Sequence, residues 1–161
     1  MEARTWTTID KTGWGDGPWN DEPDKEQWTD ETTGYACLLK RNKLGALCGY
    51  VGIPPGHPWY QISYDDVRVG QDSPDVHGGL TYSDQCQEGP VGETICHVPG
   101  PGEPEPLWWL GFDCAHAFDL SPGMRAHERE LGLSYYHHIY RDIGYVKTEC
   151  ASLAAQAKSV E

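Results

Sequence analysis

The chain has 161 residues, of which 38% are hydrophobic, and it contains seven Trp and nine Tyr. This length predicts one domain, residues 1–161, with a core in which aromatic side chains supply much of the buried area. The formal net charge of −13 excludes non-specific binding to nucleic acid, because an acidic surface repels the phosphate backbone. No apolar stretch approaches the roughly 18 residues that a membrane-spanning helix needs, so no membrane partner is expected.

All six cysteines are predicted to be thiols. The N-terminal residues lack the basic and apolar regions of a signal peptide, which indicates a cytoplasmic protein, where disulfides are rare. No pair has the Cys-x2-Cys spacing of a zinc ribbon. The alternative is two disulfides, most simply 37–48 and 86–96. The cysteines are Cys37, Cys48, Cys86, Cys96, Cys114 and Cys150.

Residues 1–33 are predicted to form an irregular, Trp-rich segment held to the body by its indoles. No helical or strand periodicity runs through them. They carry nine Asp or Glu against three Lys or Arg. One helical turn is expected at Glu22–Trp28, where Pro23 suits a first-turn position.

A β-hairpin is predicted next. The apolar runs 35–39 and 46–53 flank the polar turn 40–45. A symmetric register would set Cys37 opposite Cys48, both as small buried hydrophobic residues.

Four further strands follow in the prediction, separated by loops rich in Gly and Pro. Paired glycines weaken the second of them and indicate a bulge or the close approach of another group. The fourth is a near-continuous apolar run typical of a central buried strand. The predicted strands are 60–69, 76–82, 93–98 and 107–112.

A C-terminal helix, 136–158, is the clearest predicted element. Its apolar residues recur at steps of four and three from Ile139 to Ala157, which would place one face on a sheet. Ser134 is the expected N-cap. The predicted fold class is therefore α+β: a mostly antiparallel sheet with long loops and a C-terminal amphipathic helix packed on one face.

Two segments carry more acid–base and ligating groups than a structural core requires. They are 75–82 (Asp-Val-His-Gly-Gly-Leu-Thr-Tyr) and 108–119 (Trp-Trp-Leu-Gly-Phe-Asp-Cys-Ala-His-Ala-Phe-Asp). Each is predicted to be a strand that ends at small or reactive residues. We expect the two ends to line one concave site, although they lie far apart in the sequence.

Two chemistries are open for that site. In the first, His77 accepts a proton from a nucleophilic Cys114, which a helix start would activate, with Asp113 as a third catalytic residue. In the second, His77, His116 and either Asp119 or Asp113 hold a divalent metal as cofactor, with His57 or His97 as a further ligand. Further candidate ligand-binding residues are His116, Asp119, Tyr82, Trp109 and His57. The plainer interpretation is a buried inert thiol, surface histidines and core aromatics.

The segments 49–58 (Gly-Tyr-Val-Gly-Ile-Pro-Pro-Gly-His-Pro), 75–83 (Asp-Val-His-Gly-Gly-Leu-Thr-Tyr-Ser) and 108–117 (Trp-Trp-Leu-Gly-Phe-Asp-Cys-Ala-His-Ala) resemble a family of uncharacterised proteins from bacteria and tailed phages. Members of that family often carry Gly where this chain has Phe118, which implies a different turn before Asp119. The order His-Gly-Gly-Leu-Thr-Tyr, then Asp-Cys-Ala-His, also resembles the permuted papain-like thiol enzymes of the lecithin–retinol acyltransferase-like group. That second resemblance implies a strand His and a nucleophilic Cys at a helix start.

The leading functional hypothesis is a small phage or mobile-element protein that hydrolyses a small, nucleotide-like molecule such as a host immune signal. One alternative is a non-catalytic protein that sequesters such a ligand. The other is an acidic interaction protein that blocks a basic host partner, which the net charge permits. The sequence does not predict the oligomeric state.

Overall fold

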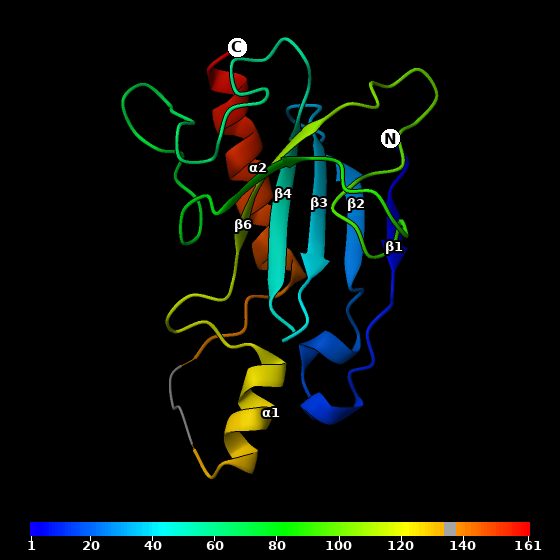
Figure 1. Ribbon diagram of the computed structural model, residues 1–161, viewed down its shortest axis with the longest axis vertical. Helices are drawn as coiled ribbons and strands as arrows, with labels where there is room; N and C mark the ends of the chain where they lie inside the picture. Colours follow the sequence, from blue (N-terminus) through cyan, green and yellow to red (C-terminus); the bar gives the residue numbers. More distant parts are fainter. Residues whose placement is uncertain (134–137) are drawn as a thin grey trace.

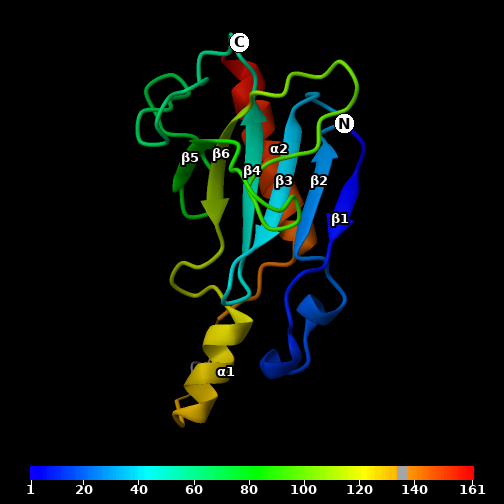
Figure 2. The same ribbon diagram turned by 45° about the vertical axis from the view of Figure 1, so that its right-hand side comes forward.

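The computed structural model describes residues 1–133 and 138–161 and has the predicted α+β class. Its six strands form one antiparallel sheet in the order β1-β2-β3-β4-β6-β5, which can be followed across Figure 2. The strands are β1 (Arg4–Trp6), β2 (Lys25–Thr29), β3 (Ala36–Arg41), β4 (Leu47–Ile53), β5 (Tyr82–Gln85) and β6 (Trp108–Asp113). No helix among the described residues is long and apolar enough to cross a membrane.

The two faces of the sheet are covered differently (Figure 1). Helix α2 (Ile143–Ser159) crosses one face and buries Val146, Cys150 and Leu153 against it. The loop that joins β5 to β6 lies over the other face, where Ile95 and Leu107 pack with Trp109. The predicted apolar helix face is thus present.

The C-terminal helix is shorter than predicted. It begins at Ile143 after the N-cap Asp142, whose side chain accepts a hydrogen bond from the Tyr145 N–H. Ile139 lies outside it and forms an isolated parallel bridge with Asp119. The predicted start at residue 136 and the predicted N-cap Ser134 lie outside the described residues.

The hairpin prediction is correct in place but wrong in register. Leu38 pairs with Tyr50 and Lys40 pairs with Cys48, so Cys37 does not lie opposite Cys48. The physical reason is a shorter turn, since β3 continues to Arg41. Asn42 closes this turn by accepting the N–H groups of residues 44 and 46 through its side chain.

The predicted helical turn at Glu22–Trp28 is wrong, because residues 25–29 form β2 and pair with β3. The prediction missed that a strand can bury polar side chains when a neighbouring loop offers acceptors. Lys25 donates to the carbonyl oxygen of Cys96, and Gln27 donates to that of Val98. Two 3-10 turns, Thr12–Trp14 and Pro18–Asn20, precede β2, so the segment 1–33 is less irregular than predicted.

A buried ion cluster holds this N-terminal segment to the sheet. Asp24 is 1% exposed and accepts from Arg41 at 2.9 Å and from Lys11 at 2.7 Å. It also accepts the N–H groups of Thr8 and Ile9. Its pKa is lowered, because these four donors outweigh the opposing effect of burial.

Of the four later strands, only 107–112 is confirmed, as β6. Residues 60–69 and 93–98 form turns, and the strand predicted at 76–82 instead begins at Tyr82, as β5. The reason at 76–82 is that Gly78 and Gly79 have φ of +67° and +78°, which a strand does not allow.

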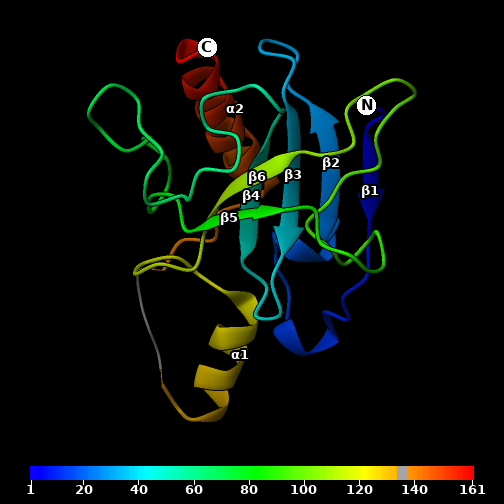
Figure 3. The same cartoon turned by 45° about the horizontal axis from the view of Figure 1, so that its top comes forward.

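Helix α1 (Pro122–Glu130) was not predicted. It begins with Pro122 at its first turn and lies beyond one end of the sheet, beside the first 3-10 turn (Figure 3). Its short length and polar composition gave no apolar periodicity to detect.

The prediction of six thiols is wrong for one pair, because Cys86 and Cys96 form a disulfide. The alternative pair 37–48 is not bonded. Cys37, Cys48, Cys114 and Cys150 are free thiols.

Candidate functional site

The side chain of Asp119 is the centre of the polar cluster that the sequence indicated. It is 1% exposed, and its Oδ2 atom lies 2.7 Å from His77 Nε2 and accepts the N–H of His116 at 3.1 Å. Its Oδ1 atom accepts from Arg141 Nε at 3.1 Å. These donors lower the pKa of Asp119 against the opposing effect of burial, so a carboxylate is present at neutral pH.

His77 is fixed from both sides of its ring. Nε2 faces Asp119, and Nδ1 lies 2.7 Å from the hydroxyl of Tyr145 on α2. The backbone N–H of His77 donates to Glu149, one turn further along the same helix. Burial raises the pKa of Tyr145, so its hydroxyl stays protonated and can donate to Nδ1 while Nε2–H donates to Asp119.

The turn before Asp119 holds a non-glycine residue in a glycine-like conformation. Phe118 has φ of +71° and is 68% exposed. For an L residue this conformation costs about 1–2 kcal/mol, so the surrounding backbone must hold it. The N–H of Ile139 donates to the Phe118 carbonyl, and the N–H of Asp119 donates to that of His116. A glycine at this position would form the turn without strain.

A second acid–base pair, His116 with Asp113, lies next to the first. His116 Nε2 is 3.3 Å from Asp113 Oδ1, at an angle that makes no hydrogen bond, and Nε2 is buried. Asp113, at the end of β6, also accepts from the Thr81 hydroxyl and from the Ala115 N–H. The ring centroids of His116 and His77 are 6.0 Å apart with the rings edge to face, so the two pairs are neighbours.

Gly78 explains how the two segments approach so closely. A Cβ atom at this position would lie 2.2 Å from His116 Nε2. The Gly-Gly pair in the sequence therefore marks a close approach, as predicted, although it lies in a turn and not in a strand.

A cleft of about 530 Å³ opens between this cluster and α1. His116 and Asp119 line its inner end, and Met124, Arg125 and Arg129 line the α1 side. The remaining lining residues are Asn42, Leu44, Ala115, Leu120, Ser121, Glu128, Leu133 and His138.

Arg125 is the most unusual group in the cleft. Its guanidinium stacks on Trp19 at 5.0 Å from the ring centre, and its buried Nε–H has no hydrogen-bond partner among the described residues. Burial and the charge of Arg129 lower its pKa, although an arginine remains charged at any physiological pH. No carboxylate of the described residues pairs with either arginine.

Cys114 lies in the same segment, between Asp113 and His116, but it is not arranged as a nucleophile. It is 2% exposed and packs in the core with α2. Burial, with the negative charges of Asp119 and Asp113, raises its pKa far above its ordinary value. The thiol is therefore protonated, whereas a nucleophilic cysteine requires a thiolate.

The metal hypothesis for His77, His116 and Asp119 has little support in the arrangement of their donor atoms. His77 Nε2 and Asp119 Oδ2 are hydrogen-bonded to each other, so these two atoms are not free to bind a metal. Within residues 1–133 and 138–161, the one group of three donors close enough to share an ion is Cys86, Cys96 and His97, elsewhere in the molecule.

Three other candidate residues lie away from the cluster. Tyr82 and Trp109 pack on the opposite face of the sheet from α2. His57 links its loop to the end of α2, with Nε2 2.9 Å from the Ala157 carbonyl oxygen, and its Nδ1 accepts from the Trp59 N–H. Each has a structural role in the fold.

Four contributors to the site were missed. Tyr145 and Arg141 complete the His77–Asp119 cluster, while Arg125 and Arg129 line the cleft. Tyr145 could have been found from the helix pattern, because it lies next to the apolar face of α2. For the arginines the sequence offers no signal beyond their charge.

Comparisons with known protein-family models, with curated proteins and with solved structures found no match. The resemblance to bacterial and phage proteins therefore stays a prediction.

Proposed function

We propose that the cleft beside α1 binds a small anionic, nucleotide-like molecule. The observation that carries the proposal is Arg125, whose buried Nε–H has no partner in the described part of the chain, in a cleft that Arg129 also lines. Glu128 also lines the cleft, but neither arginine pairs with a carboxylate of the described residues. In a chain of net charge −13, these two arginines are the groups that could attract an anion. Arginine suits phosphate, because its planar fork donates two parallel hydrogen bonds.

The cleft also offers groups that suit the rest of a nucleotide. Leu44, Met124 and Leu133 supply an apolar lining against which a base or sugar can pack. Its volume of about 530 Å³ lies within the range of small-molecule sites. The proposal includes a cytoplasmic location, where nucleotide-like ligands are found. If the protein comes from a phage, a host immune signal would be one member of this ligand class.

Hydrolysis of the bound molecule is the second candidate, and the His116–Asp113 pair favours it. The Asp113 carboxylate lies 3.3 Å from the His116 ring, and its negative charge would favour the transfer of a proton from water to His116 at the inner end of the cleft. The protonated state of Cys114 leaves this pair as the better candidate for acid–base catalysis.

Calorimetric titration with nucleoside mono-, di- and cyclic monophosphates and with inorganic phosphate tests the binding proposal. Loss of a charge-assisted hydrogen bond costs about 1.5–3 kcal/mol, so Arg129→Gln should weaken affinity by about tenfold or more. Arg4→Gln is the matched control, because Arg4 is an exposed arginine on β1 that pairs with Glu2. Equal affinity in Arg129→Gln and the wild type, or no binding of any of these anions, would overturn the proposal.

Product analysis after incubation with each bound nucleotide separates hydrolysis from sequestration. A hydrolase should lose turnover in His116→Gln while keeping most of its affinity. If the ligand binds and is recovered intact, the protein is a binder. If nothing binds, the acidic partner-blocking hypothesis becomes the leading one.

A further inference from the structure

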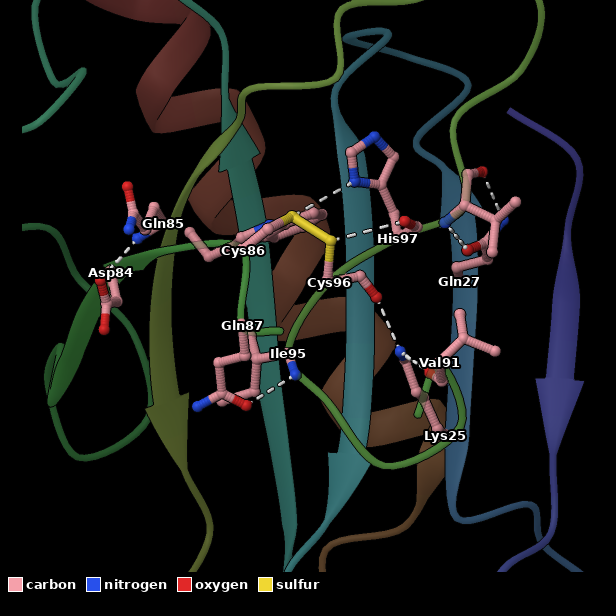
Figure 4. The surroundings of a disulfide bond; sticks show 12 residues. Lys25, Gln27, Asp84, Gln85, Cys86, Gln87, Val91, Ile95, Cys96 and His97 are labelled. Carbon is pink, nitrogen blue, oxygen red and sulfur yellow. Dashed lines mark hydrogen bonds between the residues drawn. A yellow bond between two sulfur atoms is a disulfide. The ribbon is translucent and has the colours of Figure 1, made fainter. Parts of the chain in front are cut away.

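Three potential metal ligands lie together in the loop between β5 and β6, away from the cleft. Cys86 and Cys96 are joined as a disulfide, and His97 Nδ1 lies 3.9 Å from Cys86 Sγ (Figure 4). The three donor atoms lie within 4.8 Å of one another. His97 is 5% exposed, while both cysteines are partly exposed.

We propose that this loop is a redox-controlled zinc site, in which the reduced form holds Zn²⁺ through Cys86, Cys96 and His97. Two thiolates and an imidazole form a donor set that favours zinc over the harder cations. Tetrahedral zinc with bonds to sulfur of ~2.3 Å sets two sulfurs about 3.8 Å apart. Reduction would allow the two sulfurs to move apart to that separation. The distance of 3.9 Å between Cys86 Sγ and His97 Nδ1 is already close to the spacing of two ligand atoms on one zinc ion.

The surroundings supply what thiolate ligands require. Trp109 donates its indole N–H to Cys86 Sγ at 3.3 Å, which would stabilise a negative sulfur. Lys25 is fully buried beneath the loop and donates to the Cys96 carbonyl oxygen at 2.7 Å (Figure 4). No carboxylate among the described residues pairs with Lys25, so its charge is available to offset that of the thiolates.

The chemistry balances with one co-reactant, a dithiol reductant. The disulfide takes up two electrons and two protons from the dithiol, which is itself oxidised to a disulfide. Binding of Zn²⁺ then displaces the two thiol protons. The described residues supply three ligands, so solvent would occupy the fourth position, as at zinc sites with an open coordination position.

Cobalt substitution tests the proposal on the whole protein. The chain is reduced with a water-soluble phosphine, desalted without oxygen and titrated with Co²⁺. Reduced wild type should bind one equivalent with a sulfur-to-cobalt charge-transfer band that Zn²⁺ abolishes. The oxidised protein should show no band.

Three variants complete the test. Cys86→Ser should lose the band, and His97→Gln should weaken binding by more than the ~10–100-fold typical of losing an outer-shell partner. Cys48→Ser is the control, since it removes a half-buried free thiol outside the loop and should leave the band unchanged.

Several outcomes would overturn the site. One is a reduced wild type with no band. Another is a band that survives Cys86→Ser or disappears in Cys48→Ser. A third is a reduced protein that remains unfolded by circular dichroism even with metal. Folding that returns on addition of Zn²⁺ would support the site, because a structural metal contributes folding free energy.

Discussion

Asp119→Asn should destabilise the protein by about 3 kcal/mol, measured as the free energy of unfolding in urea at pH 7. The substitution keeps the shape and one acceptor oxygen but removes the charge that pairs with His77 and Arg141. Breaking a buried ion pair by removing one partner costs about 3–5 kcal/mol. The lower end applies, because Arg141 is 24% exposed and can regain water.

The same carboxylate predicts a pH dependence of known sign. The pKa of Asp119 is lower in the folded protein than in the unfolded chain, where it is about 3.9. Its contribution is therefore present above about pH 4 and is lost as the pH falls through the folded-state pKa. The difference in unfolding free energy between wild type and Asp119→Asn should shrink over that acidic range.

Asp84→Asn is the control for this experiment. Asp84 is an exposed aspartate on β5, so its substitution should change the unfolding free energy by less than about 0.5 kcal/mol. A difference below 1 kcal/mol for Asp119→Asn, or one that is constant from pH 7 to pH 3, would refute the assignment of Asp119 as the charged centre of the cluster.

Gly78→Ala should displace the His116 ring, because the new Cβ would lie 2.2 Å from it. Since His116 lines the cleft, the displacement should change the shape of the cleft and weaken ligand binding. Gly56→Ala, with φ of +90° and open space around the new Cβ, should change unfolding but not binding. Calorimetry on both variants checks this, and equal binding in the two would contradict it. Cys37 has a pKa raised by burial to about 12, so its contribution to stability is lost as the pH rises above the unfolded value of about 8.5. The fall in unfolding free energy between pH 9 and 10.5, followed anaerobically in urea, should be less steep in Cys37→Ala by about 1.4 kcal/mol per pH unit, and an unchanged slope would count against a buried thiol. Cys114 should resist iodoacetamide at pH 8 in the folded protein and react after urea unfolding, as read by mass spectrometry. Rapid labelling in the folded state would restore the nucleophile hypothesis.

The sequence predicted those elements whose pattern depends on local packing. The apolar run before Asp113 became β6, and the stripe ending at Ala157 became the buried face of α2. The site prediction used the same signal, because ligating residues that follow strand ends tend to meet. His77 and Asp119 do meet, 42 residues apart in the chain.

The failures share a different cause, which is that distant partners override local pattern. Lys25 and Gln27 look like surface residues, but loop carbonyls satisfy them inside the protein. Arg41 extends β3 beyond the predicted turn because Asp24 pairs with it in the core. The catalytic role of Cys114 stays a prediction, and its burial in the core with α2, which argues against that role, is invisible in the residues beside it.

The order of strands in the sheet has a consequence for how the molecule reaches its native state. Strands β2, β3 and β4 are consecutive and can pair through short connections, whereas β6 joins β4 only after an intervening segment of 54 residues, 54–107, which includes β5. Closing such a loop costs about 3.5 kcal/mol beyond the constant part of the closure entropy. Pairing at long separation is slow, so we expect β6 to add to the sheet late. Asp113 is the last residue of β6, and His116 and Asp119 follow it. The cleft would therefore be completed only at the end of folding, and a partly folded chain would expose α1 without the side chains that line the inner end of the cleft.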